Sequence, residues 1–163
     1  MGLGPPYFNN WRVIISWYTN HPAYFTDPGD LSPSVNHAAA DAMVAKAASV
    51  WNVQTSSLVL ARGGTLDEHL SGANVYGSAN GPVFPADVQT TNYAAKQIAV
   101  VYDSDGSITD MLLGSGASDP SGCLQSGVTE SVDSITREAQ IQHAILVLNG
   151  RCTGPEPEKQ TQI

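Results

Sequence analysis

The chain has 163 residues, which is enough for one domain and short for two. Fifteen acidic and seven basic residues give a formal net charge of −8, which argues against nucleic acid or an anionic membrane surface as a partner. A hydrophobic content of 42% excludes a disordered acidic tail. The longest purely apolar run, residues 144–148, is far shorter than the ~20 residues of a membrane span.

The first third of the chain predicts a strand, a turn and a long helix. Residues 1–10 are rich in Gly, Pro and Asn and predict a flexible lead-in. Residues 12–18 are β-branched and aromatic, as in a strand. Residues 27–30, Asp-Pro-Gly-Asp, predict a turn. Ser32-Pro33 is a helix-opening pair, so the Ala-rich segment 34–51, which has no Gly or Pro, is expected to be helical.

The two faces of this helix are expected to differ. Four residues fall on one stripe at helical period and are expected to pack on a sheet: Ala39, Met43, Ala47 and Val50. His37, Asp41 and Ala48 are expected on the opposite side. His37 and Asp41 are four positions apart, and a solvated pair is favoured there over a pair of metal ligands.

The rest of the chain predicts further strands around one long connecting segment. The expected strands are residues 57–61, 97–102 and 141–148. Residues 65–95 have weak periodicity and several Gly and Pro, with Val83-Phe84 as a brief edge strand. Residues 114–122 predict a loop and residues 153–163 a polar tail. We therefore expect a single α/β (α+β) domain over residues 11–152, a twisted mixed sheet of about five strands with one long backing helix.

The two cysteines, Cys123 and Cys152, both lie in turn-rich segments. A bridge between them is favoured and would stabilise the fold by about 3 kcal/mol; two buried free thiols are the alternative. The low Lys content and polar, exported-looking composition favour a secreted or extracytoplasmic protein. Residues 1–6 lack the pattern of a signal peptide, so any leader is expected to lie outside this chain.

Five stretches together resemble the first half of a matrixin-like domain of the metzincin zinc metalloproteases. They are Tyr24–Leu31 (YFTDPGDL), Ala47–Asn52 (AASVWN), Val59–Gly64 (VLARGG), Val100–Ile108 (VVYDSDGSI) and Ala144–Gly150 (AILVLNG). The resemblance covers roughly residues 11–152. It implies a twisted sheet with one backing helix, which in that family precedes the active-site helix.

The sequence departs from this family at the site of its chemistry. Such enzymes bind zinc through His-Glu-x-x-His on a helix, where the Glu activates the metal-bound water. This motif occurs nowhere in the chain. On this interpretation the polypeptide is the front portion of a protease-like domain, and peptidase activity by the family mechanism is not expected from it.

One acidic turn has the composition of a calcium site. Asp103, Asp105, Ser107 and Asp110 could offer several oxygens to a hard cation. The Asp-x-Asp-Gly core looks like the middle of an EF-hand loop, but Leu112 stands where the bidentate Glu would be. A plain acidic turn, whose carboxylates accept backbone amide protons, is favoured over calcium binding.

The histidines offer zinc ligands without a local ligand motif. The candidate zinc set is His37, Asp41, His69 and His143, which only folding or oligomerisation could collect. Glu68, His69 and His143 are also the weak candidates for catalytic residues. For the cluster around His69, a polar surface loop without a catalytic or metal-binding role is favoured. For His143, a buried histidine of a strand is favoured.

Three function classes follow from these observations. The first is a secreted, non-catalytic, protease-like domain that acts by binding. The sheet face left open by the missing half would drive a homodimer or bind a missing C-terminal half. The second is a zinc-dependent hydrolase of activated esters or phosphoesters, with a site rebuilt from His and carboxylates, for example across a dimer interface. The third is a surface module stabilised by calcium.

Overall fold

The fold is known from a computed structural model. It describes residues 16–52, 58–79, 81–89, 96–119, 127–135 and 140–152, with residues 127–135 described by their backbone alone. Within these ranges no helix is long and apolar enough to cross a membrane. The predicted lead-in 1–10 and the tail 153–163 lie outside the described residues, as do residues 12–15 of the first predicted strand.

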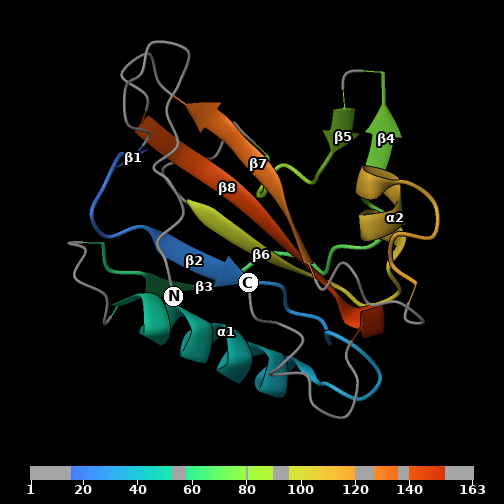
Figure 1. Ribbon diagram of the computed structural model, residues 1–163, viewed down its shortest axis with the longest axis horizontal. Helices are drawn as coiled ribbons and strands as arrows, with labels where there is room; N and C mark the ends of the chain where they lie inside the picture. Colours follow the sequence, from blue (N-terminus) through green and yellow to red (C-terminus); the bar gives the residue numbers. More distant parts are fainter. Residues whose placement is uncertain are drawn as a thin grey trace.

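A mostly parallel β-sheet forms the centre of the molecule (Figure 1). Its strands lie in the order β1-β8-β6-β2-β3, all paired in parallel, and β7 pairs antiparallel with β8. The bounds are β1 Ser16–Trp17, β2 Ala23–Thr26, β3 Ala61–Thr65, β6 Ile98–Asp103, β7 Gly127–Ile135 and β8 Gln140–Asn149. The predicted α/β class is therefore confirmed, as are the strands at 97–102 and 141–148. The strand β7 was not predicted.

The strand expected at residues 57–61 is displaced toward the C-terminus. β3 spans Ala61–Thr65 and includes Arg62, Gly63 and Gly64, which lie beyond the predicted strand end at residue 61. Glycine is needed here because the ring of Phe25 fills the space beside the chain: a Cβ on Gly63 would lie 2.3 Å from its Cζ. The strand prediction failed because this glycine pair serves close packing, not a turn.

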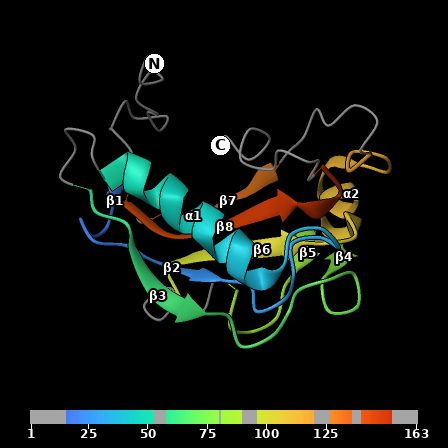
Figure 2. The same cartoon turned by 90° about the horizontal axis from the view of Figure 1, so that it is seen from below.

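The helix α1, His37–Asn52, lies across one face of the sheet (Figures 1 and 2). It begins later than predicted, because Asn36 caps it: its Oδ1 accepts the amide of Ala39 at 3.0 Å. Ser32 instead closes a tight turn by accepting the amide of Val35 at 3.1 Å. The core on this side contains Tyr24, Leu31, Val35, Ala40, Ala48, Val100, Tyr102 and Leu148.

The predicted apolar stripe of α1 is confirmed only at Met43, which is partly buried and packs against the core on this side. Ala39 and Ala47 are exposed and Val50 is 54% exposed, whereas Ala40 and Ala48 are buried. The buried face is rotated by about one residue and includes the partly buried His37 and Asp41. Alanine occurs on every side of this helix, so hydrophobicity alone could not distinguish the faces. The polar pair is accommodated because the sheet supplies its hydrogen-bond partners, described below.

The long segment after β3 covers the other face of the sheet. Five of its residues, Leu66, Leu70, Val75, Phe84 and Val88, are buried against Ala99 and Val101 of β6 and Ile145 and Val147 of β8. The segment also forms the antiparallel pair β4 Tyr76–Ser78 and β5 Gly81–Val83, so Val83 is in a strand whereas Phe84 is core. The helix α2, Ser107–Leu113, which was not predicted, contributes Ile108 to the same core. Described elements therefore pack on both faces of the sheet.

Candidate functional site

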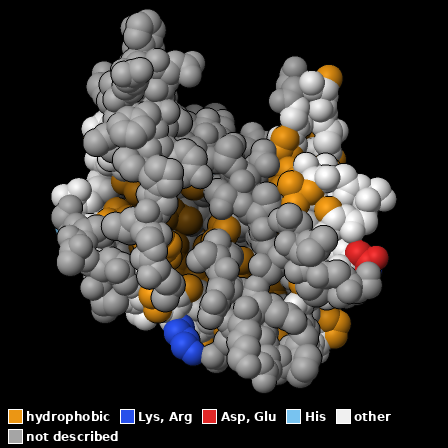
Figure 3. Space-filling view, in the orientation of Figure 1, with side chains coloured by type: hydrophobic (Ala, Val, Ile, Leu, Met, Phe, Trp, Pro, Cys, Tyr) orange, Lys and Arg blue, Asp and Glu red, His pale blue; other side chains and the backbone are white. Residues whose placement is uncertain are grey.

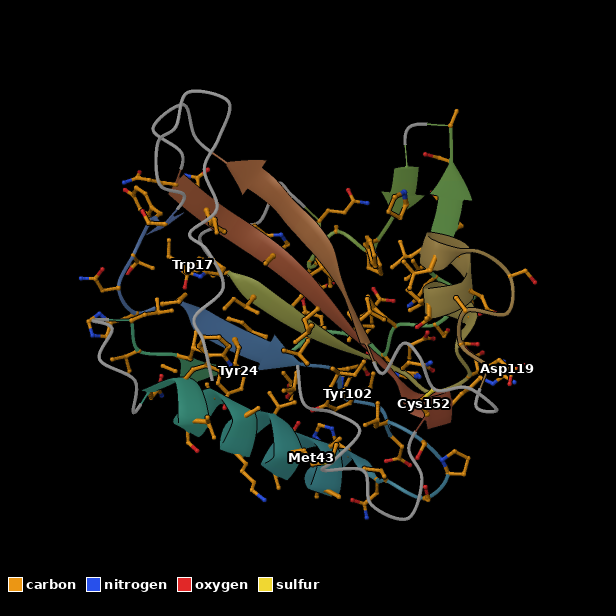
Figure 4. All side chains as sticks on the ribbon, in the orientation of Figure 1. Trp17, Tyr24, Met43, Tyr102, Asp119 and Cys152 are labelled. Atoms are coloured by element: carbon orange, nitrogen blue, oxygen red, sulfur yellow. The ribbon has the colours of Figure 1, made fainter. Side chains whose placement is uncertain are left out.

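An apolar groove lies between α1 and the sheet. It has a cavity volume of ≈ 180 Å³ and is partly open to solvent. It is lined by Tyr24, Met43, Val44, Ala47, Ala48, Trp51, Leu60, Ile98, Val100, Leu146 and Leu148. Figure 3 shows hydrophobic side chains gathered in a hollow of this face, and Figure 4 shows Tyr24 of β2 and Met43 of α1 in the layer between sheet and helix. Among the residues that the structure describes, a single helix about 10 Å across packs on this face and does not span the full width of the sheet.

Exposed apolar side chains stand beside this groove. Trp51 lines it and is 50% exposed, and its neighbour Val50 is 54% exposed. Val59, in the segment that leads into β3, is 39% exposed and directly precedes Leu60, which lines the groove. Its amide donates to the carbonyl of Asn20, close to the exposed Tyr18 in sequence. Exposed aromatic and aliphatic groups next to an apolar groove are typical of an association surface.

A polar network lies between the N-terminal part of α1 and the sheet. The Asp41 carboxylate accepts from the hydroxyl of Tyr102 at 2.9 Å and pairs with the Arg62 guanidinium at 2.5 Å. His37 Nε2 lies 3.5 Å from the same carboxylate. Burial, reinforced by the hydrogen bond to Asp41, raises the pKa of the Tyr102 phenol far above its ordinary value. The expected solvated His37–Asp41 pair is therefore wrong: Asp41 is tied to the sheet, since it is the partner of a fully buried tyrosine.

A second polar pair lies where β2 ends. Asp27 is fully buried, and its Oδ1 lies 2.6 Å from Nδ1 of His69, whose side chain is 37% exposed. The same carboxylate accepts the amides of Gly29 at 2.8 Å and Leu70 at 3.0 Å. Glu68 accepts a hydrogen bond from the amide side chain of Asn74 at 2.8 Å. Sequence reasoning flagged His69 and Glu68 but missed Asp27, which is the group that orients the ring.

The carboxylates proposed as calcium ligands accept hydrogen bonds from backbone amides. Asp103 is fully buried and accepts the amides of Ile108 at 3.2 Å and Thr109 at 2.7 Å, at the start of α2. Burial raises the pKa of its carboxyl. Asp105 accepts the amide of Ser107 at 2.9 Å, and a hydrogen bond from the Ser107 hydroxyl lowers the pKa of Asp105. These contacts are those expected of the plain acidic turn; calcium binding stays a prediction.

The Asp110 carboxylate in α2 is expected to make the stability of the fold depend on pH. Its carboxylate accepts the amide of Ser118 at 2.7 Å, and this hydrogen bond lowers its pKa. A lowered folded-state pKa stabilises the fold above the unfolded value and loses this effect as pH falls through the folded value. We therefore expect the wild type to melt above Asp110→Asn at neutral pH. The difference should shrink as the pH falls below about 4. Thermal unfolding of both proteins over this pH range measures it, and a difference that grows toward acid would contradict the assignment.

The candidate zinc ligands lie in separate elements, apart from His37 and Asp41. His143 is fully buried in β8, and His69 lies in the segment after β3. In the described ranges no group of three or more His, Cys, Asp or Glu side chains is arranged to hold a metal ion. Cys152 is buried in the short helix η2, Gly150–Cys152, whereas Cys123 lies outside the described residues, so the bridge stays a prediction.

Two of the residues that sequence reasoning missed share one signal. Asp27 directly follows β2 and Tyr102 is the residue before the end of β6, whereas Arg62 lies near the start of β3. Polar groups at the carboxyl ends of parallel strands meet at one edge of the sheet. No family model, no curated protein and no solved structure matches this chain, so the metalloprotease resemblance stays a prediction.

Proposed function

We propose that this chain is a secreted, metalloprotease-like binding domain that lacks the family's catalytic zinc helix and acts by self-association. The observation that carries the proposal is the apolar groove between α1 and the sheet. Its walls come from α1, β2, β6 and β8 and are almost entirely apolar. A surface of this kind is stabilised when a second apolar surface excludes water from it.

A second copy of the chain is the occupant that the surface fits best. In a two-fold dimer the same patch faces itself, so the patch must carry both a projecting group and a place to receive it. Trp51 and Val50 project beside the groove that Trp51 also lines. Tryptophan is among the residue types that most often anchor an interface, and the half-exposed Trp51 has surface left to bury there. A C-terminal half of the kind that the resemblance implies would be an alternative occupant of the same groove.

Two matched substitutions on α1 test this proposal. Ala47 and Ala45 are both exposed alanines of the same helix, but Ala47 lines the groove and Ala45 does not. We expect the wild type and Ala45→Glu to form dimers. Ala47→Glu should dimerise roughly a hundredfold more weakly, because it buries an unpaired charge in an apolar interface. Sedimentation velocity over a wide concentration range measures this, with circular dichroism as a check on folding.

Two outcomes would overturn the proposal. One is a wild type that stays monomeric at the highest concentration reached. The other is a dimer that Ala47→Glu and Ala45→Glu weaken equally, since this would place the interface away from the groove.

A zinc-dependent hydrolase of activated esters or phosphoesters is the second candidate. It is supported by one observation, the buried Asp27 carboxylate behind His69, because metal-ligating histidines commonly donate their other ring N–H to such a group. Turnover of a chromogenic ester that chelator abolishes and zinc restores would support it. It should be lost in His69→Ala or His143→Ala. Turnover indifferent to chelator would rule it out.

A further inference from the structure

The Asp27–His69 pair lies at a special position in the sheet topology. From β2 the chain crosses through α1 to β3, on one face of the sheet. From the end of β6 the chain continues through α2, which packs on the opposite face, to β7 and then to β8 on the other side of β6. The connections that follow β2 and β6 therefore leave in opposite directions. In open parallel sheets, ligands bind outside the carboxyl ends of the strands at such a point. Asp27 is the residue that directly follows β2.

The hydrogen bonds of Asp27 assign the proton on the His69 ring. Both carboxylate oxygens act as acceptors: Oδ2 accepts the Leu70 amide, and Oδ1 accepts the Gly29 amide and faces Nδ1 of His69. Nδ1 therefore carries the hydrogen and donates it, and Nε2 carries the lone pair. Nδ1 faces the buried Asp27, so Nε2 lies on the ring edge away from this carboxylate. The His69 side chain is 37% exposed, and Nδ1 makes its side-chain hydrogen bond among the residues that the structure describes.

The ring of His69 is held in place from two further sides. It packs over Gly29, where a Cβ would lie 2.2 Å from Nδ1, so a glycine is required beneath the ring. The side chain of Asn74 donates to the carbonyl of His69 at 2.9 Å and fixes its backbone. The neighbouring acids are engaged elsewhere: Glu68 with Asn74, and Asp67 with Lys96 at 2.6 Å. A fixed, partly exposed imidazole with its lone pair outward is the arrangement of a nucleophile or general base.

We propose that His69 is a metal-independent nucleophile toward activated acyl compounds, with Asp27 as its positioning residue. Nε2 attacks the acyl carbon of an aryl ester; a C–N bond forms, and the C–O bond to the aryl group breaks and releases the aryloxide. The acyl-imidazolium is positively charged, and the Asp27 carboxylate at Nδ1–H stabilises that charge. Water then attacks the acyl carbon and gives up one proton to the solvent as the C–N bond breaks, and the products are a carboxylic acid and the free, neutral imidazole. This activity is independent of the self-association proposed above.

Hydrolysis of p-nitrophenyl acetate tests the inference. We expect His69→Gln to lower the second-order rate of p-nitrophenolate release about tenfold or more. His21→Gln serves as the control, because His21 is an exposed histidine in the loop between β1 and β2. It should keep the wild-type rate, and chelator should not change that rate. Equal losses in the two variants would overturn the inference. Turnover that a chelator abolishes would also overturn the inference and would point to the zinc-dependent candidate instead.

Asp27→Asn separates positioning from folding. The ¹⁵N shifts of His69 should report the Nδ1–H tautomer in the wild type and a shift toward Nε2–H in the variant, since an amide can donate to Nδ1. The rate should fall with it. A wild-type His69 that is already in the Nε2–H form would contradict the assignment even if the variant failed to fold.

Discussion

Replacing Leu70 by alanine should lower the free energy of unfolding by about 3 kcal/mol, the cost of a cavity at a fully buried leucine. Leu70 lies in the long segment after β3 and packs with Val101 and Val147 on the sheet face opposite α1. For a chain of this length, the midpoint of thermal unfolding should fall by about 9 °C. Calorimetry or denaturant unfolding measures the effect.

Leu113→Ala is the matched control for this substitution. Leu113 ends α2 and is 45% exposed, so its loss should change stability by less than about 0.5 kcal/mol. A Leu70→Ala protein as stable as Leu113→Ala would mean that the segment 66–89 is not part of the core. The face of the sheet opposite α1 would then have to be covered by something else.

Asp103→Ala should destabilise the protein by about 2 kcal/mol at neutral pH. The carboxylate accepts the buried amides of Ile108 and Thr109, which the substitution leaves unsatisfied. The loss is partly offset because burial of the carboxylate is itself unfavourable and raises its pKa. Denaturant unfolding at several pH values measures both effects.

The sign of the pH dependence follows from that raised pKa. The folded state holds the Asp103 proton more tightly than the unfolded state, so the group favours folding most below its ordinary pKa of 3.8. The advantage of the wild type over Asp103→Ala should therefore fall as pH rises from about 4 through the folded pKa. Asp105→Ala, whose carboxyl has a lowered pKa, should show the opposite trend. A common trend in both variants would contradict these assignments.

The parts of the fold that the sequence predicted are those with strong local patterns. The apolar runs around Val100 and Leu146 predicted β6 and β8, because a strand buried on both faces reads as a continuous apolar stretch. The segment 66–89 was harder, since its core residues are spaced by turns and have no single period. The strand β7 was missed because residues 127–135 mix polar and β-branched residues without a clear alternation.

The candidate sites show the same division. His69 was visible as a polar residue in a long loop, but its partner Asp27 is 42 positions away, and only the fold brings them together. His37 and Asp41 were correctly paired by their helical spacing, but their burial depended on Tyr102 and Arg62. The groove depends on how far one helix covers the sheet, and no local pattern in the sequence records that.

Hydrogen exchange measured at a low and a high protein concentration distinguishes self-association through the groove from association elsewhere. At high concentration we expect added protection of the backbone amides in the C-terminal half of α1, which contains Ala47 and Trp51, and around Leu146 and Leu148 of β8. The amides of β4 and of α2 should be unchanged, because neither element lines the groove. Identical exchange at both concentrations, or added protection only at β4 and α2, would show that the groove is not the interface.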